Sequence, residues 1–170
     1  IASSASAFSS LSLCLVDIEK SILGKNDFSN KASFISRLGS GSACRSVYGP
    51  AALWGKTNLL SDSNDNYAVP FKLPNFYSDY CDTILIVDEN SKSVSSSTGH
   101  ELIKNHYFKS NRIVQANANL ENLINSIKKN DTHQFIEIIE NEALTLHAMM
   151  LTSNPSFILF KPNTINIINK

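Results

Sequence analysis

The pattern of hydrophobic and polar positions predicts a chain built mostly of helices, with two short strands in its middle. Residues 5–23 carry apolar side chains three and four positions apart, which is the spacing of one helix face. These side chains are Phe8, Leu11, Leu15, Ile18 and Ile22. The first part of the segment is rich in Ser and Ala, so it allows close approach of another backbone. Gly24 follows at a position suited to a left-handed helix cap.

The next segments predict two helices separated by a small loop. A short helix is expected over about residues 31–37, followed by the loop "LGSGS" at 38–42. The sequence "ACRSVYGPAALW", residues 43–54, predicts a second helix. Pro50 lies well inside it and should kink or split it, because proline lacks the amide hydrogen and crowds the preceding turn.

Two strands are predicted between residues 60 and 90. Residues 67–73, "YAVPFKL", favour a strand, and Pro70 places it at a sheet edge or a bulge. Residues 82–89, "DTILIVDE", are apolar and rich in β-branched side chains, which is typical of a strand buried on both faces.

The remainder of the chain predicts helices. Three are expected over about 99–108, 111–129 and 133–150. Asp131 and Gln134 form a capping-box pattern before the third helix. Residues 157–160 are compatible with either a strand or a helix, and a last helix begins after Pro162. The fold class is therefore α/β, in the α+β sense, with a subdomain boundary near residue 60.

Composition narrows the class of protein. The 170 residues suit one domain or the joined parts of two small ones. Acidic and basic residues balance at 15 each, so no global field attracts nucleic acid or an anionic membrane. The three cysteines lack the spacing of a disulfide framework or a zinc site, which favours a reducing, cytoplasmic setting. No apolar run reaches the roughly 20 residues of a membrane span.

The stretch "GSGSACRS", residues 39–46, is the main candidate for chemistry. If a helix begins at Ala43, Ser42 is its N-cap, and the free N–H groups of the first turn favour an anion. Arg45 then lies in the first turn, where its charge opposes the helix dipole. A bound carboxylate or phosphate explains it. The alternative is that Arg45 pairs with a carboxylate of the protein itself.

Two further hydroxyl-rich stretches precede helices, "ASSAS" at 2–6 and "VSSST" at 94–98. Backbone N–H groups at such helix starts can bind phosphate. Taken alone, each stretch favours an ordinary capped helix over a phosphate site. The histidines and aspartates show no spacing that indicates a catalytic acid or base, so the sequence predicts anion binding without naming a base.

These motifs resemble one family. "GSGSACRS" resembles the signature of the mevalonate diphosphate decarboxylases, which are members of the GHMP small-molecule kinase superfamily. "ASSAS" resembles the end of that superfamily's Gly/Ser-rich phosphate loop. The Ser-rich loop before Gly99 and "ALTLHAMML" at 143–151 occur at matching places, so the resemblance covers nearly the whole chain.

The resemblance implies a two-lobed GHMP-kinase-like fold. Residues 1–60 would be the C-terminal part of a ribosomal-S5-like lobe that binds nucleotide and substrate, and residues 61–170 an incomplete ferredoxin-like lobe. The implied enzyme uses ATP and Mg²⁺ to phosphorylate the tertiary hydroxyl of mevalonate 5-diphosphate. Loss of phosphate and CO2 then gives isopentenyl diphosphate, a step of isoprenoid biosynthesis in the mevalonate pathway. Both ligands are polyanions, which fits hydroxyls, N–H dipoles and an arginine.

The resemblance also implies roles for individual residues. Arg45 would hold the carboxylate or diphosphate of the substrate. Four serines would contact the same substrate: Ser40, Ser42, Ser95 and Ser96. Ser3 and Ser4 would line the ATP phosphates, with Mg²⁺ shared among those phosphates and no metal ligand assigned in this chain. The family's partners are small molecules, not nucleic acid or membrane, and its members form homodimers.

The sequence departs from the family in what it lacks. The family's catalytic aspartate lies in a D-A-G-x-N motif, which does not occur here and is expected beyond residue 170. The chain therefore reads as a central fragment, and we expect the isolated 170 residues to be inactive. Two alternatives remain: a kinase of mevalonate or phosphomevalonate that does not decarboxylate, and a non-catalytic relative.

Overall fold

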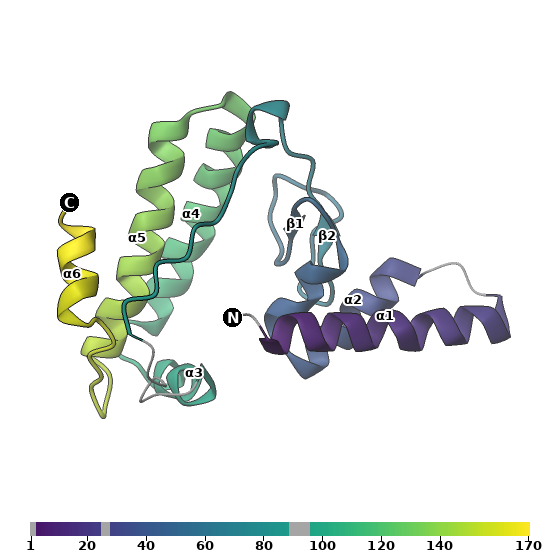
Figure 1. The fold of residues 1–170 in the computed structure, drawn as a ribbon, viewed down its shortest axis with the longest axis horizontal. Coiled ribbons are helices and arrows are strands. Elements are labelled where there is room, and N and C mark those ends of the chain that lie inside the picture. Colours follow the sequence, from purple (N-terminus) through teal and green to yellow (C-terminus); the bar gives the residue numbers. More distant parts are fainter. Residues whose placement is uncertain (1–2, 25–27, 89–95) are drawn as a thin grey trace. The chain divides into compact units, whose positions relative to one another are not determined.

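The computed structural model describes residues 3–24, 28–88 and 96–170 (Figure 1). The chain divides into two compact units, Ile1–Ser78 and Asp79–Lys170. The predicted division into an S5-like lobe over 1–60 and a ferredoxin-like lobe over 61–170 stays a prediction, and the compact units meet later in the chain than residue 60.

The first unit begins with helix α1, Ser3–Leu23. The predicted cap is confirmed: Gly24 has a φ of +66° and donates its N–H to the carbonyl of Lys20 at 2.9 Å. The predicted apolar stripe is largely exposed, with Ile22 at 73%. The buried side of α1 instead carries Ser9, Ser12 and Val16. The two serines are small, which allows the close backbone approach that the Ser/Ala content predicts.

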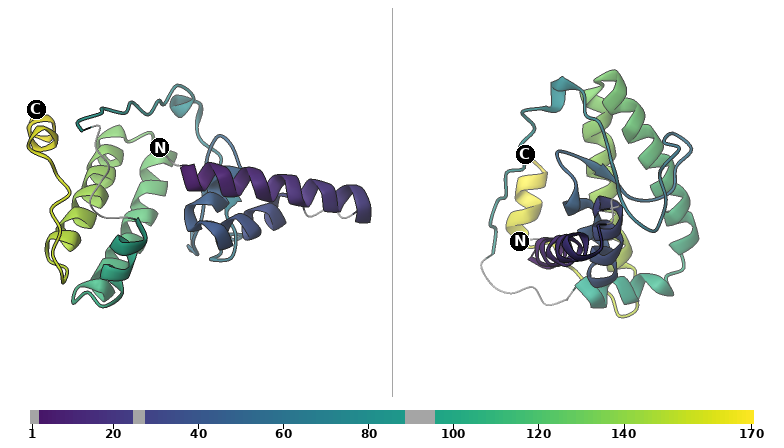
Figure 2. Two further views of the ribbon diagram at one scale, coloured as in Figure 1. Left: turned by 60° about the horizontal axis from the view of Figure 1, so that its bottom comes forward. Right: turned by 90° about the vertical axis from the view of Figure 1, so that its right-hand side faces the viewer.

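Helix α2, Phe28–Gly39, lies against α1 in all the ribbon views (Figures 1 and 2). It is longer than the predicted 31–37. Its packed face consists of small side chains, and Ala32, Ser33 and Ser36 are fully buried. An ion pair between Lys31 and Glu19 ties the two helices together at their edge.

The predicted helix over 43–54 is wrong. Residues Gly41–Val47 form a short 3-10 helix, η1, and Ala52–Leu53 form strand β1. The Gly49–Pro50 peptide is cis, and proline supplies no N–H with which to continue a helix. The predicted strand at 67–73 is present as β2, Val69–Pro70, which pairs antiparallel with β1, Leu53 opposite Val69.

Backbone carbonyls of the loop after β1 accept hydrogen bonds from two long side chains, Trp54 and, on α2, Arg37. The Trp54 indole N–H donates to the carbonyl of Asp65 at 3.1 Å, and Arg37 Nε donates to the carbonyl of Asn66 at 2.7 Å. A second 3-10 helix, η2, spans Asn75–Tyr77 and closes the first unit.

In the second unit, the strand predicted over 82–89 is not present in its described part. Residues 82–88 form no ladder, and Ile84, Leu85 and Ile86 are all more than half exposed. A strand buried on both faces needs neighbouring strands, and the only sheet among the described residues is the β1–β2 pair. Among the described residues, no strand pairs with this β-branched segment.

The helices of this unit follow the prediction closely. They are α3, Ser96–Lys104; α4, Lys109–Lys129; and α5, Thr132–Leu151. Asn130, in the left-handed conformation with φ 55°, ends α4. Asp131 caps α5, because its carboxylate accepts the N–H of Gln134 at 3.0 Å, as predicted.

Helix α6, Pro162–Ile168, has proline in its first turn, as predicted. Residues 157–160, which the sequence left open between strand and helix, are neither.

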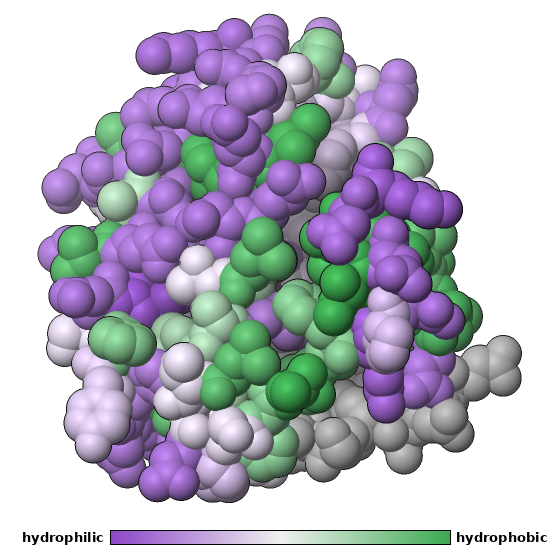
Figure 3. All heavy atoms as spheres, turned by 90° about the vertical axis from the view of Figure 1, so that its left-hand side faces the viewer, coloured by the Kyte–Doolittle hydropathy of each residue, from purple (hydrophilic) through white to green (hydrophobic). Residues whose placement is uncertain are grey.

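Figure 3 shows apolar residues at the surface among hydrophilic ones, and Ile158 and Ile168 are at least half exposed. None of the described helices combines the length and apolar character that crossing a bilayer requires.

Candidate functional site

The stretch 39–46 is built from the end of α2 and the whole turn of η1. Ser40 N–H donates to the carbonyl of Ser36 at 3.0 Å, which continues the α2 ladder by one residue. Ser40 then adopts an extended conformation, φ −150° and ψ 120°, and its carbonyl accepts the N–H of Ala43 at 2.9 Å. The chain therefore turns sharply between two helices of different type.

A fully buried pair, Ala43 and Cys44, anchors this turn. The Cys44 thiol donates to the carbonyl of Gly41 at 3.0 Å, and the Cys44 carbonyl accepts from the Ser33 hydroxyl at 2.8 Å. Burial raises the pKa of the Cys44 thiol, although the neighbouring Arg45 charge opposes that shift. Cys44 is therefore a packing residue and not a nucleophile.

Two glycines of the stretch lie against aromatic rings, which leave no room for a side chain at Gly39 and little room at Gly41. A Cβ on Gly39 would stand 2.1 Å from Cδ1 of Phe8, on α1. A Cβ on Gly41 would stand 3.2 Å from Cη2 of Trp54. The two glycines thus allow Phe8 of α1 and Trp54 to pack closely against the backbone of the turn.

The polar members of the stretch remain accessible. Ser42, Arg45 and Ser46 are exposed, whereas Ser40 is half-buried. Within the described residues Arg45 forms no ion pair with a carboxylate. The alternative in which Arg45 is neutralised by the protein itself therefore has no support in this part of the chain, and the guanidinium is available to a ligand.

The structure corrects the helix-start argument for this site. Ser40, not Ser42, is the N-cap of η1, and it makes no side-chain cap bond. Arg45 lies in the last turn of η1 and not in the first, so its charge does not oppose the helix dipole. The case for an anion near Arg45 therefore rests on its accessible, unpaired charge and no longer on a dipole conflict.

The two predicted serine sets of the first unit come together. Ser3 and Ser4 begin α1 and are exposed. The Ser4 hydroxyl oxygen lies 3.3 Å from that of Ser40, although the two residues are 36 positions apart. The resemblance assigns Ser4 to the nucleotide and Ser40 to the substrate, so the structure joins hydroxyls of both predicted sets at one point.

The third predicted serine pair cannot be placed. Ser95 lies outside the described residues, and Ser96 begins α3 with a side chain that is outside them too. The helix start that the Ser-rich loop predicts is present, three residues earlier than the expected Gly99. The proposed contacts of Ser95 and Ser96 stay predictions.

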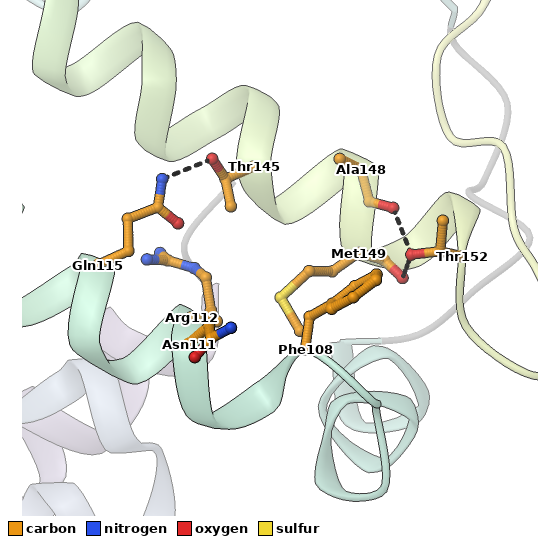
Figure 4. Close-up of a pocket in the computed structure, with 8 residues that line it drawn as sticks. All are labelled: Phe108, Asn111, Arg112, Gln115, Thr145, Ala148, Met149 and Thr152. Atoms are coloured by element: carbon orange, nitrogen blue, oxygen red, sulfur yellow. Dashed lines mark hydrogen bonds between the residues drawn. The ribbon is translucent and has the colours of Figure 1, made fainter.

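A second concave site, which sequence reasoning missed, lies between α4 and α5. A cavity of about 450 Å³ is lined by residues of both helices and of the turn before α4: Phe108, Asn111, Arg112, Gln115, Thr145, Ala148, Met149 and Thr152 (Figure 4). Phe108 and Met149 face each other in it, and Gln115 donates to Thr145 at 3.2 Å. The sequence did carry a signal for this site, because Arg112, Gln115 and Asn119 are three and four positions apart and so place polar side chains on one face of α4.

Arg112 is committed to the protein in this cavity. Its guanidinium forms a two-pronged pair with the Glu142 carboxylate, which also accepts from Asn119 at 2.8 Å. Burial raises the pKa of Glu142, but the hydrogen bonds from Arg112 and Asn119 outweigh that effect and lower it overall. The arrangement is a clasp between two helices and leaves no free charge for an anion.

Two histidines of this unit, His106 and His147, pack against other side chains of the same unit. His106 is buried, and its Nδ1 accepts the N–H of Phe108 at 3.1 Å while Nε2 lies 3.0 Å from the Thr152 hydroxyl. The His147 ring stacks on Phe160 at 3.8 Å, and burial lowers its pKa. The contacts of both rings are accounted for by these neighbours within the protein.

Comparison with known proteins identifies the relatives of this chain. Residues 1–67 match the family model of the diphosphomevalonate decarboxylase-like N-terminal domain. Diphosphomevalonate decarboxylase of Danio rerio is 31% identical over 125 residues, which are 72% of this chain and 31% of the relative. The corresponding enzyme of Ganoderma lucidum is 29% identical over 157 residues, 91% of this chain and 38% of the relative.

Solved structures agree in fold. Mevalonate diphosphate decarboxylase from Legionella pneumophila superposes with a TM-score of 0.80 at 29% identity, over 99% of this chain and 50% of that one. A complex with MVAPP, AMPPCP and magnesium gives the same TM-score at 26% identity, again over 99% and 50%. The predicted resemblance and the GHMP-kinase-like fold are confirmed, and the chain spans half or less of the relatives it matches.

Proposed function

We propose, starting from this relationship to the diphosphomevalonate decarboxylases, that the chain forms part of an enzyme that decarboxylates mevalonate 5-diphosphate with ATP. The γ-phosphoryl group of ATP would pass to the tertiary hydroxyl, leaving ADP. Departure of that phosphate together with CO2 would then create the double bond of isopentenyl diphosphate. The pathway is the mevalonate route to isoprenoids.

The single observation that carries the proposal is the meeting of Ser4 and Ser40 at 3.3 Å. Phosphoryl transfer requires the nucleotide and its acceptor to lie side by side, since catalysis is mostly positioning and charge stabilisation. The start of α1 offers hydroxyls and N–H groups to one polyanion. The adjoining turn offers Ser40, Ser42 and the accessible Arg45 to the other.

Each residue then has a chemical task in the proposed enzyme. Arg45 would grip the carboxylate or a diphosphate oxygen pair of the substrate with two parallel hydrogen bonds. Ser40 and Ser42 would bond the same substrate, and Ser3 and Ser4 would contact the ATP phosphates. We extend the substrate role to Ser95 and Ser96 from the resemblance alone.

The residues of this chain fit an Mg²⁺ ion that arrives bound to the phosphates of ATP. Across residues 3–24, 28–88 and 96–170, no three His, Cys, Asp or Glu side chains gather as a metal-binding group. The donors near Ser4 are hydroxyls, which suit an ion brought in by phosphates. When bound, Mg²⁺ would neutralise phosphate charge, while Ser3 and Ser4 would orient the phosphate chain.

The proposal includes the setting of the enzyme. A cytoplasmic location fits the balanced charge and the unpaired cysteines, Cys14, Cys44 and Cys81. A homodimer follows from the resemblance. The D-A-G-x-N motif that holds the family's catalytic aspartate does not occur in these 170 residues, and we expect them to release no CO2 on their own.

The test is an assay of the full-length protein with ATP, Mg²⁺ and mevalonate 5-diphosphate, following CO2 and analysing products by mass spectrometry. Isopentenyl diphosphate and ADP in equal amounts support the proposal. A phosphorylated substrate that keeps its carboxylate would identify a kinase instead. No turnover of mevalonate or either phosphate ester would identify a non-catalytic relative.

Arg45→Ala sharpens the test. We expect kcat/KM to fall by on the order of 10²-fold or more, the scale of losing one charge-assisted contact in a site. Lys72→Ala is the matched control, because it also removes an exposed positive charge from the first unit. An Arg45→Ala enzyme with the kcat/KM of the control would remove Arg45 from the site.

A further inference from the structure

The Ser33 side chain occupies an unusual place beneath the turn that carries Arg45. It is fully buried on α2, and its one hydroxyl makes two bonds to backbone from different directions. It donates to the carbonyl of Cys44 at 2.8 Å and accepts the N–H of Ala68 at 2.9 Å. Three segments therefore meet at one oxygen atom: α2, η1 and the residue before β2.

The bonded carbonyl belongs to the peptide group that joins Cys44 to Arg45. The bond constrains the orientation of that peptide and, with it, the position from which the Arg45 side chain leaves the backbone. Cys44 and Ala68 are themselves fully buried, so water cannot replace the hydroxyl as a partner. Removing it would leave the buried N–H of Ala68 unpaired and would take from the Cys44 carbonyl its bond to α2.

We propose that Ser33 is a positioning residue for substrate binding: its hydroxyl sets the orientation of the Cys44–Arg45 peptide and thereby the reach of the Arg45 guanidinium. The effect on substrate binding rests on the proposed function. The link between Ser33 and the turn rests on the two hydrogen bonds described above. Ser33 touches no ligand itself and acts through Arg45.

The chain supplies a matched control in Ser36. It lies on the same helix, is equally buried, and differs by bonding only within α2, to the carbonyl of Ser33 at 2.9 Å. Ser33→Ala and Ser36→Ala each delete one buried oxygen of the same helix. Only Ser33→Ala breaks the link to η1 and to Ala68.

The first measurement is steady-state kinetics of the full-length enzyme. Ser33→Ala should raise KM for mevalonate 5-diphosphate about tenfold, the scale of one lost buried hydrogen bond, with kcat within about twofold. Ser36→Ala should leave KM unchanged. A merely structural loss would reduce the amount of folded enzyme, which lowers apparent kcat and leaves KM alone. Equal KM values for Ser33→Ala and wild type, or for the two variants, would overturn the proposal.

Two further variants keep the result decisive. In an Arg45→Ala background, Ser33→Ala should no longer change KM, and a second tenfold rise there would contradict action through Arg45. If Ser33→Ala does not fold, Ser33→Cys decides, because its thiol fills the site but is a weak donor and acceptor. Its KM should exceed that of Ser36→Ala; a wild-type KM would overturn the proposal.

A measurement independent of turnover separates this inference from the proposed function. Amide hydrogen exchange of residues 41–47 should accelerate in Ser33→Ala and stay at the wild-type rate in Ser36→Ala. If the wild-type protein released no CO2, the proposed function would fail, yet this exchange difference would still support Ser33 as the residue that orders the turn. Equal exchange in both variants would overturn that role.

Discussion

In residues 1–78 buried serine hydroxyls bond to backbone. Residues 79–170 also contain buried serines that bond to backbone, Ser126 and Ser153, but there long side chains that are not fully buried bond one another between α4 and α5. Ser33 and Ser36 are the pattern in the first unit, each bonding a carbonyl below 3.0 Å. Arg112 with Glu142, and Gln115 with Asn141, are the pattern in the second. The first arrangement fixes backbone to backbone through a single atom, and the second joins helices through flexible arms.

The difference bears on function. A short hydroxyl has few rotamers, so a segment held by it keeps one position, as a ligand-binding turn requires. Long arms can adjust their torsions and still keep their bond. We therefore expect the first unit to lose stability when volume is added where the turn is tightly packed, and the second unit to lose stability when a charged or capping side chain is removed.

The largest stability effect should come from adding one methyl group at the turn. Gly39→Ala would place a Cβ inside contact distance of three ring atoms of Phe8, the nearest at 2.1 Å. We expect a loss of about 2–3 kcal/mol in the free energy of unfolding of the first unit, typical of overpacking. Peptide-resolved hydrogen exchange measures this for each unit separately.

Controls for this variant are available nearby. Gly49→Ala should be nearly neutral, because nothing lies within 4 Å of the added Cβ. In a Phe8→Ala background, Gly39→Ala should lose most of its cost, since the obstructing ring is gone. A full penalty in that background would show that the helix end itself, and not Phe8, requires glycine.

Sequence patterns predicted the second unit better because its signals are local. Asp131 with Gln134 marks a cap within one turn, and the apolar period of 133–150 is complete within the helix. The strand at 82–88 failed for the opposite reason: its burial depends on neighbouring strands, which no local pattern reports. The helix over 43–54 failed because tertiary bonds to α2 and β2 decide the backbone there.

The site was predictable in composition but not in geometry. The resemblance supplied Ser4, Ser40 and Arg45 as separate candidates, and composition supplied the expectation of a local anion site. Nothing in the sequence placed Ser4 beside Ser40 or identified Ser33 as the atom beneath the turn, because both facts are contacts between residues far apart in the chain. The cavity at Arg112 is different, because the spacing of polar residues along α4 indicates a polar helix face there.

Next in size is removal of the cation from the α4–α5 clasp. Arg112→Ala should cost about 2 kcal/mol of stability in the second unit, because a hydrogen-bonded carboxylate loses its charged partner. Lys128→Ala, an exposed cation at the end of the same helix, should change stability by less than about 0.5 kcal/mol. Similar losses in the two variants would mean that the clasp contributes no more than surface charge.

A smaller loss is expected at the hairpin turn itself. Asp131→Ala should cost about 1 kcal/mol, because it leaves the N–H of Gln134 without its cap at the start of α5. Asn130→Gly is the control at the adjacent position, since glycine adopts the left-handed conformation at no steric cost. Thermal unfolding of both variants, followed by far-UV circular dichroism, measures the difference. A drop in Asn130→Gly as large as that in Asp131→Ala would assign the effect to the turn and not to the cap.

The smallest effect should be the response of the second unit to pH through Glu142, because burial and hydrogen bonding act on it in opposite directions. The net shift lowers the pKa of Glu142 below its ordinary value of 4.5. A lowered pKa in the folded state means that the unfolded chain binds the proton more readily. The contribution of Glu142 to stability is therefore complete above about pH 4.5 and is lost as the pH falls through the folded-state pKa.

Glu142→Gln cannot titrate. Below about pH 4.5, hydrogen exchange of α4 and α5 should therefore depend less on pH in this variant than in wild type, after correction for intrinsic exchange rates. The same pH dependence in wild type and Glu142→Gln would show that the clasp holds by packing alone, and the contrast with the rigid hydroxyl links of the first unit would then disappear.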